Sequence, residues 1–568
     1  MRNDEIAGVL EEIADMLEMT GENFYRVRAY RNAARTVQDY PAPLSGLSRE
    51  KIDALPGIGA DLAEKIATLA AGGEVPLHAR LKKTFPAGLL ELRTLPGLGP
   101  KRIKLLHDRL KISSLDDLRR ALAAGQLGTI GGFGAKSEER LLKALETRAA
   151  QPAEKRWPRH EAAATAQELL AWIKTAHGVE NLAIAGSLRR GRETVGDIDL
   201  LAASSDAAAV MERFLAFPAV ERRLGAGETR ASVVLRGGLQ VDLRAIESAS
   251  WGAALVYFTG SKAHSVHLRK IAQGAGLLLN EYGLFRGKRR VAGADEDGVY
   301  KALGLRPVPP ELREDRGEIE AAAGRGHLPH LIAAGDLRGD LHAHSNWTDG
   351  RASIEEMARG ARKRGLEYFA LTDHSRRLAM AHGLDPVRLR EQRKKIERVA
   401  GQVGIRILRG IEVDILDDGE LDLPDHALAE LDWVVASVHS RLGEDEQVMT
   451  RRLVRAIENR HVDSIGHPSN RLIGKREPSH FDFTEVLKAA RDQGCALEVN
   501  SQPDRLDLTD TDCLAAKHAG VKLVIASDAH VPQDFDGLAG GVLQARRGWI
   551  EPGDVLNTLP VDELLSRR

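Results

Sequence analysis

The sequence predicts a multidomain α/β protein with a helical N-terminal region, a mixed α+β middle region and a C-terminal distorted (βα) barrel. Its 568 residues are too many for one hydrophobic core, so two to four domains are expected. Apolar residues recur at helical spacing near the start, and strand-like runs appear after residue 180. Strands alternate with helices after residue 335, and the proline- and glycine-rich stretch 306–326 marks the clearest linker.

The composition excludes several classes of protein. Hydrophobic residues make up 43% of the chain, and no apolar run is long enough to span a membrane. The first residues lack the basic-then-apolar order of a signal peptide. Two cysteines, Cys495 and Cys513, are too few for a disulfide framework. We therefore expect a cytoplasmic protein.

The net charge of −1 hides a segregation of charge along the chain. Residues 80–111 hold nine Lys and Arg against two Asp and Glu, whereas residues 411–447 hold twelve Asp and Glu against one Arg. This asymmetry indicates one surface that binds a polyanion and another that binds cations, although solvated helix faces would explain either segment alone.

The helical region contains a repeated glycine motif. The string Leu-Pro-Gly-x-Gly ends at Gly59 and again at Gly99, a looser copy ends at Gly134, and each copy precedes a helical pattern. It resembles the helix-hairpin-helix motif, whose glycines let backbone N–H groups approach a DNA phosphate. The copies lie beside the basic residues 80–111 and so predict sequence-independent DNA binding. The candidate DNA-contacting residues are Gly57, Gly59, Gly97, Gly99, Lys101, Gly132 and Gly134.

The central region carries two carboxylates on one predicted strand. Asp197 and Asp199 are two residues apart, so on a strand both point to the same face. Such a pair repels itself unless cations lie between the carboxylates, and two Mg²⁺ ions are the usual solution. A solvated strand face is the alternative. Asp242, on a later predicted strand, is a third carboxylate that would accept a proton or complete a metal shell.

A candidate phosphate-binding turn precedes the strand that carries Asp197 and Asp199. Gly186 and Ser187 offer backbone N–H groups to a phosphate tail, and Arg190 adds a cation. Gly-Ser, Asp-x-Asp and a later strand Asp form the pattern of the nucleotidyltransferase superfamily. The string Tyr-Phe-Thr-Gly-Ser at 257–261 resembles the sugar-reading motif of family X DNA polymerases, whereas ordinary core aromatics are the alternative for its two rings. The resemblance implies nucleotide binding by Tyr257, Phe258, Gly260, Ser261, Lys262, Ser265 and Arg269.

Lys65 follows the first hairpin in a string, Leu-Ala-Glu-Lys-Ile, that resembles the vertebrate repair members of family X. In those relatives the lysine forms a Schiff base that removes deoxyribose phosphate, and Tyr30 resembles a neighbouring tyrosine. Asp61 stands where those relatives carry a lysine. A solvent-exposed helix lysine is the favoured alternative for Lys65.

The C-terminal region is rich in histidine. Eleven of the nineteen histidines follow residue 335, and seven short apolar runs there end in polar residues, repeatedly His, Asp or Glu. A single histidine at a strand end is usually a hydrogen-bonded core residue, but seven such ends indicate the face of a (βα) barrel where active sites form. Imidazoles with bridging carboxylates suit Zn²⁺, Mn²⁺ or Fe²⁺ rather than Mg²⁺ alone.

These strand ends resemble those of the PHP (polymerase and histidinol phosphatase) domain. The resemblance implies a site for three metal ions and hence metal-dependent phosphoester hydrolysis. It assigns His342, His344, Glu412 and Asp528 to the first ion, Glu412, His439 and His467 to the second, and Asp349, His374 and His530 to the third. A neighbouring phosphate would bind Arg376, Arg377 or Arg471, and the sequence does not choose among them.

The order of hairpins, polymerase motifs and PHP domain resembles the bacterial and archaeal family X DNA polymerases. The boundaries we expect are 1–80 for a lyase-like helix-hairpin-helix domain, 81–150 for a second one, 151–245 for a nucleotidyltransferase palm, 246–315 for a nucleotide-gripping subdomain, 316–335 for a linker and 336–568 for the PHP domain.

The resemblance implies a monomeric, nucleoid-associated repair enzyme of base excision repair. It would fill short gaps in DNA from dNTPs with Mg²⁺ or Mn²⁺, and its PHP domain would act as a 3′–5′ exonuclease, 3′-phosphatase or abasic-site nuclease. One alternative is a nucleotidyltransferase on RNA or a small molecule with a PHP phosphatase. The other is a DNA-end-binding scaffold with a structural PHP domain.

Overall fold

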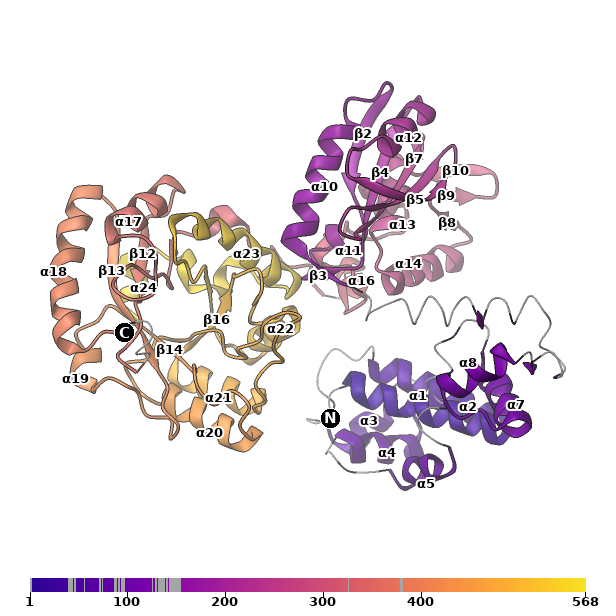
Figure 1. Ribbon diagram of the computed structural model, residues 1–568, viewed down its shortest axis with the longest axis horizontal. Coiled ribbons are helices and arrows are strands. Elements are labelled where there is room, and N and C mark those ends of the chain that lie inside the picture. Colours follow the sequence, from indigo (N-terminus) through magenta and orange to yellow (C-terminus); the bar gives the residue numbers. More distant parts are fainter. Residues whose placement is uncertain are drawn as a thin grey trace. The chain divides into compact units, whose positions relative to one another are not determined.

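A computed structural model of the chain shows two compact units, residues 1–155 and 156–568 (Figure 1). Among the described residues no helix combines the length and the apolar character needed to cross a bilayer. The structure describes residues 3–567 except 39–43, 45–46, 56, 71–72, 74, 86–88, 90–91, 93–94, 96–97, 125, 128–129, 131–137, 139–140, 143–154, 325 and 378–381.

The first unit is helical, and one hydrophobic core runs through it. This core joins Ile6 and Leu62 to Ile103 and Leu118, so the two domains expected on either side of residue 80 share it. The helices are α1 (Asn3–Thr20), α2 (Phe24–Gln38), α3 (Arg49–Asp53), α4 (Ala60–Ala70), α5 (Pro76–Thr84), α7 (Pro100–Leu110) and α8 (Leu115–Ala123).

The palm begins the second unit with a five-stranded sheet in the order β2-β4-β7-β6-β5. Only β4 and β7 pair in parallel; the other neighbours are antiparallel. The apolar faces of α10 and α12 pack on the sheet and form the core of the palm. The elements are β1 (Trp157–Pro158), α10 (Arg159–Ile173), β2 (Val179–Ile184), α11 (Gly186–Arg189), β3 (Thr194–Val195), β4 (Asp197–Ser204), α12 (Ala207–Leu215), β5 (Val220–Ala226), β6 (Arg230–Leu235) and β7 (Gln240–Ile246).

The gripping subdomain packs two helices, α13 and α14, beside a small antiparallel sheet of β8, β9 and β10. The expected linker 316–335 is partly built into it, because Ile319 and Ala322 of α16 lie in the same core as Val256 and Leu268. The elements are α13 (Trp251–Thr259), α14 (Lys262–Gly274), β8 (Leu278–Asn280), β9 (Gly283–Arg286), β10 (Arg289–Ala292), α15 (Glu296–Ala302) and α16 (Glu318–Ala322).

The C-terminal domain is a seven-stranded parallel sheet in sequence order. It curls into a barrel, because Ala343, after the first strand, pairs with Ala529, after the last. One side of the strands packs on the helices, and Leu408, Val435 and Val524 on the other side fill the barrel interior. The strands are β11 (Gly339–Asp340), β12 (Tyr368–Leu371), β13 (Arg406–Asp414), β14 (Trp433–Ser437), β15 (Ser464–Ile465), β16 (Ala496–Asn500) and β17 (Leu523–Ala526).

Helices surround the barrel, as strand–helix alternation in the sequence predicts (Figure 1). Cys495 and Cys513 are free and buried in the layer between helices and strands. The helices are α17 (Ile354–Lys363), α18 (Pro386–Val403), α19 (Asp425–Leu428), α20 (Glu446–Ile457), α21 (Phe483–Gln493), α22 (Asp510–Ala519), α23 (Leu538–Arg547) and α24 (Val561–Leu565).

Candidate active sites of the palm and the barrel

Three carboxylates meet on the palm sheet. Asp197 and Asp199 lie two residues apart on β4, and Asp242 on β7 is the register partner of Asp199. One oxygen from each of the three lies within 4.8 Å of the others, which is close enough to hold a metal ion. The solvated strand face, the alternative interpretation of Asp-x-Asp, does not account for a third carboxylate brought in from a separate strand.

The carboxylate of Asp199 lies in an unfavourable electrostatic position. Burial, together with the charges of Asp197 and Asp242, raises the pKa of Asp199 to about 7. Gly186 lies directly against it: its φ is +61°, and a Cβ there would lie 2.0 Å from Asp199 Oδ2. Only glycine fits this position, so the backbone at the start of α11 can approach the carboxylates.

A cleft of about 350 Å³ opens beside the carboxylates. Its lining includes nearly all of the residues that the sequence assigns to the nucleotide, together with Thr259, which sequence reasoning missed. Asp242 and Ser261 do not line it. The lining residues are Gly186, Ser187, Arg190, Asp197, Asp199, Tyr257, Phe258, Thr259, Gly260, Lys262, Ser265 and Arg269.

The Tyr-Phe pair forms one wall of this cleft at the end of α13. The two rings meet edge to face with centroids 5.1 Å apart, and the guanidinium of Arg244 lies over the ring of Phe258. Tyr257 is 37% exposed, so it is not an ordinary core aromatic. Gly260 ends the helix with a φ of +66°, and the Ser261 hydroxyl accepts the backbone N–H of His264 and caps α14. The cap explains why Ser261 stays out of the cleft.

Arg190, a predicted phosphate ligand, is held by protein groups. Its Nε donates to Glu314 at 3.1 Å, and its Nη1 donates to the carbonyl of Thr259. The neighbouring Arg189 of the palm forms a bidentate ion pair with Glu296 of the gripping subdomain. The two consecutive arginines therefore connect α11 to the gripping subdomain.

Two histidines of α14 have structural partners. His264 is fully buried, with Nδ1 2.6 Å from Glu318 and Nε2 2.8 Å from the hydroxyl of Tyr300. His267 Nδ1 lies 2.8 Å from Asp315. Both carboxylates come from about fifty residues further along the chain, so the sequence near the histidines gives no sign of them.

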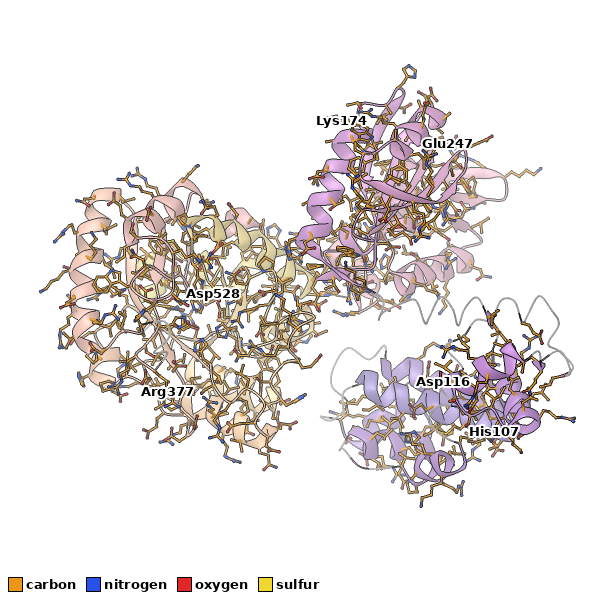
Figure 2. All side chains as sticks on the ribbon, in the orientation of Figure 1. His107, Asp116, Lys174, Glu247, Arg377 and Asp528 are labelled. Carbon is orange, nitrogen blue, oxygen red and sulfur yellow. The ribbon has the colours of Figure 1, made fainter. Side chains whose placement is uncertain are left out.

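The carboxyl ends of the barrel strands carry the predicted metal ligands. His342 and His344 follow β11, His374 follows β12, and Glu412 lies near the end of β13. The remaining predicted ligands are His439, His467, Asp528 and His530, at the ends of the later strands, and Asp349, in the loop before α17. Asp528, labelled in Figure 2, lies within the barrel domain.

Glu412 lies at the centre of this group. Its Oε2 is 2.9 Å from His374 Nδ1, 3.4 Å from His342 Nε2 and 3.6 Å from His344 Nε2. Its Oε1 is 3.1 Å from His467 Nε2 and 3.2 Å from His439 Nε2. One carboxylate thus faces five imidazoles, as expected for a group that bridges metal ions.

Three subsets of these side chains are compact enough to hold a metal ion. All three differ in part from the sets that the resemblance implies: the first lacks Glu412, the second has His374 in place of His467, and the third adds His344. The subsets are His342, His344 and Asp528; His374, Glu412 and His439; and His344, Asp349, His374 and His530.

The imidazole nitrogens fit metal ligation. His342 Nε2, His374 Nδ1 and both nitrogens of His344 are buried and, although carboxylates lie close to them, form no hydrogen bond of acceptable geometry among the described residues. Burial, together with the neighbouring His530, lowers the pKa of His344 to about 3, so its ring is neutral, which is the form that binds metals. Buried polar atoms without partners are costly, and a bound cation would satisfy them.

Two further carboxylates contact the predicted histidine ligands and orient them. Sequence reasoning assigned these carboxylates no role. Glu498 Oε1 lies 2.9 Å from His342 Nδ1, and its Oε2 accepts the backbone N–H of His467. Asp414 Oδ1 lies 2.9 Å from His439 Nδ1. Such partners fix the ring orientation of a metal-binding histidine. Glu498 lies within one strand-end run and Asp414 lies two residues after the run that ends at Glu412, and this position is the signal that could have found them.

The arginines near the barrel mouth have different partners from those the sequence suggests. Arg471 donates to Glu193 of the palm and to the carbonyl of Leu506. Arg376 and Arg377 are about half exposed and lie near Asp422 and Asp417. Arg505, which sequence reasoning missed, lies 4.0 Å from Asp528, and its buried Nη1 has no hydrogen-bond partner among the described residues.

The hairpin motif of the first unit has the predicted local geometry where it is described. Gly59 directly precedes α4 and Gly99 directly precedes α7, and Gly57 has a φ of +78° that favours glycine. Gly97, Gly132 and Gly134 lie outside the described residues, as does the side chain of Lys101 on α7.

Lys65 differs from the expectation of an exposed helix lysine. Its side chain is 18% exposed, and its ammonium forms an ion pair with Asp61 one turn earlier. Tyr30 is buried nearby; burial raises the pKa of its phenol, and the charge of Lys65 opposes that rise.

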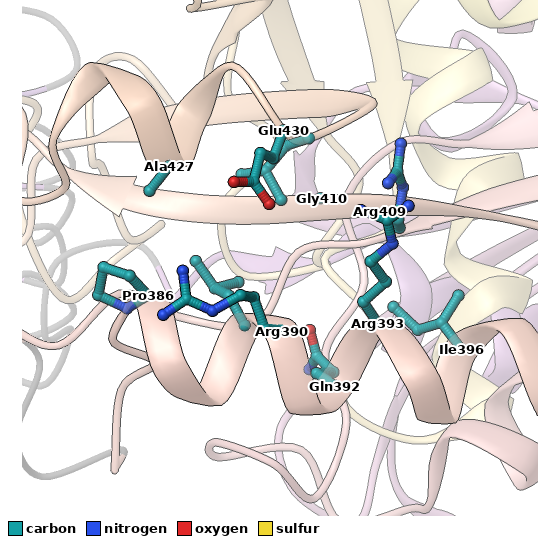
Figure 3. A pocket seen from close by; sticks show the side chains of 11 residues that line it. Pro386, Arg390, Gln392, Arg393, Ile396, Arg409, Gly410, Ala427 and Glu430 are labelled. Carbon is teal, nitrogen blue, oxygen red and sulfur yellow. The ribbon is translucent and has the colours of Figure 1, made fainter.

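One further cavity lies under α18, away from both clusters (Figure 3). Its volume is about 30 Å³, the space of roughly one water molecule. Arg390, Arg393, Arg409 and Glu430 are among the side chains that line it. We assign it no role.

Comparison with known proteins identifies the domains that carry the two candidate sites. Family models match most of the chain: a helix-hairpin-helix domain at 1–75, a SAM-like helix-hairpin-helix tandem at 89–147, the DNA polymerase beta palm at 156–231, the DNA polymerase beta thumb at 254–314 and a PHP domain at 340–502. These matches define a polymerase beta-like core joined to a PHP domain.

Individual relatives give the same picture. A Bacillus subtilis protein named DNA polymerase/3′-5′ exonuclease PolX is 38% identical over 563 residues, 98% of this chain and 97% of that protein. A probable phosphatase of Thermoanaerobacter sp. is 35% identical over 39% of this chain and 89% of its own length. A probable phosphatase of Shewanella sediminis is 35% identical over 34% of this chain and 78% of its own length. The chain belongs to the family X DNA polymerases that carry a PHP domain.

Proposed function

We propose that the protein is a DNA polymerase that fills short gaps during base excision repair, with a 3′–5′ exonuclease or related phosphoesterase activity in its PHP domain. The observation that carries the proposal is the cleft beside Asp197, Asp199 and Asp242, lined by the residues expected to hold a nucleotide. The name of the Bacillus subtilis relative, which covers nearly the whole chain, supports both activities.

In the palm, Asp197, Asp199 and Asp242 would hold two Mg²⁺ or Mn²⁺ ions. When bound, such ions neutralise charge at the reacting phosphate and activate the primer 3′-hydroxyl. The backbone at Gly186 and Ser187 would receive the triphosphate, with Arg190, Lys262 and Arg269 as its cations. Tyr257 and Phe258 would lie against the deoxyribose, and Gly260, Ser261 and Ser265 would shape the site around the nucleotide. The buried Ser265 hydroxyl, without a partner among the described residues, is available to a ligand.

In the barrel, the nine predicted ligands would hold three ions of Zn²⁺, Mn²⁺ or Fe²⁺. When bound, these ions supply a hydroxide nucleophile and neutralise the phosphate. Glu412 would bridge the ions, and Glu498 and Asp414 would orient His342 and His439. Arg505, with an unpartnered buried Nη1, is our candidate for the arginine that binds the substrate phosphate.

The partners of this enzyme would be gapped or primed DNA and dNTPs. The hairpins around Gly57, Gly59, Gly97, Gly99, Gly132 and Gly134, with Lys101, would grip the DNA backbone on both sides of a gap. Lys65, with Tyr30, is the candidate for a deoxyribose-phosphate lyase. Each domain would have the boundaries expected from the sequence. The protein would act as a monomer at the nucleoid.

A gel assay with Mn²⁺ tests the proposal. The substrate is a 5′-labelled primer in a one-nucleotide-gapped duplex, with and without dNTPs. Lengthening with dNTPs and shortening without them are expected. An unchanged primer in both lanes would contradict the proposal, and lengthening alone would contradict the exonuclease part.

The probable phosphatases that match the barrel favour a second candidate for this domain, the hydrolysis of small phosphomonoesters. Release of phosphate from p-nitrophenyl phosphate, compared with release of nucleotides from the primer, separates the two. Activity on the small ester alone would favour this second candidate.

A further inference from the structure

A helix of the PHP domain supports the turn that carries Arg190. The turn, Arg190 and Gly191, follows α11 at the edge of the nucleotide cleft. Arg159 of the palm donates both to the carbonyl of Gly191 at 3.0 Å and to that of Gly540 at 2.8 Å, on α23. A Cβ on Gly191 would lie 2.8 Å from Leu543, so the turn packs directly on the helix.

The contacts on α23 fall on one face. Gly540, Leu543 and Arg547 are three and four residues apart, which places them in a row along a helix. Arg547 is 3% exposed and donates to the carbonyl of Arg190 at 2.7 Å. It also donates to Glu314 at 3.1 Å and to Asp510 at 2.7 Å. A PHP residue thus contacts both the Arg190 backbone and the carboxylate that holds the Arg190 side chain.

Glu314 is shared between two arginines. Arg190 Nε and Arg547 Nη1 both lie 3.1 Å from its Oε1. Arg190 Nε and Nη1 are occupied by Glu314 and the carbonyl of Thr259, so turning these donors to a triphosphate would take the guanidinium away from Glu314. That carboxylate is only 13% exposed, and a buried anion without a cation is costly. Arg547 holds Glu314 through its own contact and would lower that cost if Arg190 left.

We propose that Arg547 is a positioning residue for nucleotide binding, which compensates Glu314 so that Arg190 can turn to the triphosphate. The inference rests on the proposed polymerase function. The PHP domain then contributes to nucleotide binding through α23, and its own metal-binding side chains are not involved.

The test measures KM and kcat for single dNTP incorporation into a one-nucleotide gap with Mg²⁺, using the full chain. Arg547→Met should raise KM for the dNTP about tenfold, equivalent to about 1.4 kcal/mol, with a smaller change in kcat. The matched control is Arg546→Met. Arg546 is the next residue on α23 and also bonds outside the barrel, to Glu311 at 2.8 Å, but it contacts neither Arg190 nor Glu314. This variant should keep the wild-type KM.

A second substitution separates positioning from mere support of the fold. Adding Glu314→Gln to Arg547→Met removes the buried anion and should return KM to within about twofold of wild type. A purely structural role predicts further loss. If Arg547→Met leaves KM unchanged, if Arg546→Met raises it equally, or if the double variant is worse, the inference is overturned.

Separate controls test whether the Arg547→Met variant is folded and whether the proposed polymerase function is correct. Thermal unfolding and primer shortening report whether Arg547→Met is folded. If it is not, Glu314→Gln alone decides, because it should lower KM below that of the wild type, and an unchanged or higher KM would overturn the inference. A wild-type protein that fails to extend any primer would refute the proposed function instead.

Discussion

Asp199 and Asp242 are register partners on β4 and β7, the one parallel pair in the palm sheet. Their carboxylates, with that of Asp197, converge within 4.8 Å. Burial, together with this mutual repulsion, raises the pKa of Asp199 to about 7. The site is therefore arranged for cations at the expense of stability.

The first prediction concerns that stability. Asp199→Asn should raise the melting temperature in EDTA at pH 8, because it removes a charge that the fold disfavours. The free energy of unfolding should rise by about 2 kcal/mol. This is roughly half of the value that the pKa shift alone would give, because the side chain is partly exposed. The pKa of Asp199 is raised above its ordinary value, 3.8, so the gain should be complete above pH 7 and vanish as the pH falls towards 4.

Thermal unfolding of both proteins between pH 5 and 8 checks this. Addition of Mg²⁺ should reduce the difference, because a cation relieves the same repulsion in the wild type. A destabilised Asp199→Asn protein at pH 8 would show that the carboxylates do not repel as described.

The second prediction is that the two activities separate. Asp197→Ala should reduce primer extension about a thousandfold or more and leave primer shortening intact, because it removes a ligand from the palm alone. His344→Ala should do the reverse. Each variant is the control for the other in one gel assay. Loss of both activities in either folded variant would contradict the model of two sites.

The third prediction tests the carboxylate behind His342. Glu498→Gln should lower the metal affinity of the barrel or its hydrolytic activity about 10- to 100-fold, because His342 loses the partner that orients it. Metal content after dialysis and primer shortening measure this. Glu458→Gln, at an exposed position of the same domain, is the control, and primer extension should not change in either variant.

The fourth prediction concerns Lys65. The Nζ of Lys65 is held by the Asp61 carboxylate and must leave that contact to reach a sugar aldehyde, so the wild type should form little Schiff base with a 5′-deoxyribose phosphate end. Asp61→Asn removes the partner and should increase the adduct trapped by borohydride several-fold. Lys65→Ala should abolish it. Equal trapping in all three proteins would show that another amine reacts.

The sequence was sufficient for features that depend on strand geometry. Asp197 and Asp199 share a face because strand side chains alternate, and the barrel ligands meet because parallel strands end at one edge. The strand pairing and the burial of these side chains agree with that reasoning. The cleft residues Tyr257 and Gly260 were found through a short string whose resemblance to polymerase motifs carries spatial information.

Features that depend on distant pairing were beyond that reasoning. His264 bonds to Glu318 and Arg471 bonds to Glu193, across 54 and 278 positions of the chain. The same holds for the packing of α16 into the gripping subdomain, which turns part of an apparent linker into core. The proline-rich residues before α16 have the composition of a flexible linker. The burial of Ile319 depends on partners elsewhere in the chain, which local sequence patterns do not reveal.

The pairing of Ala343 with Ala529 has a consequence for synthesis of the chain. It brings His342 and His344 beside Asp528 and His530, nearly two hundred residues apart, so the hydrolytic centre needs both ends of the barrel. A ribosome-bound chain that stops short of residue 530 would lack part of the hydrolytic centre and also α23, on which the Arg190 turn of the palm packs. Both sites are therefore expected to be complete only after the last barrel strand and α23 have been translated.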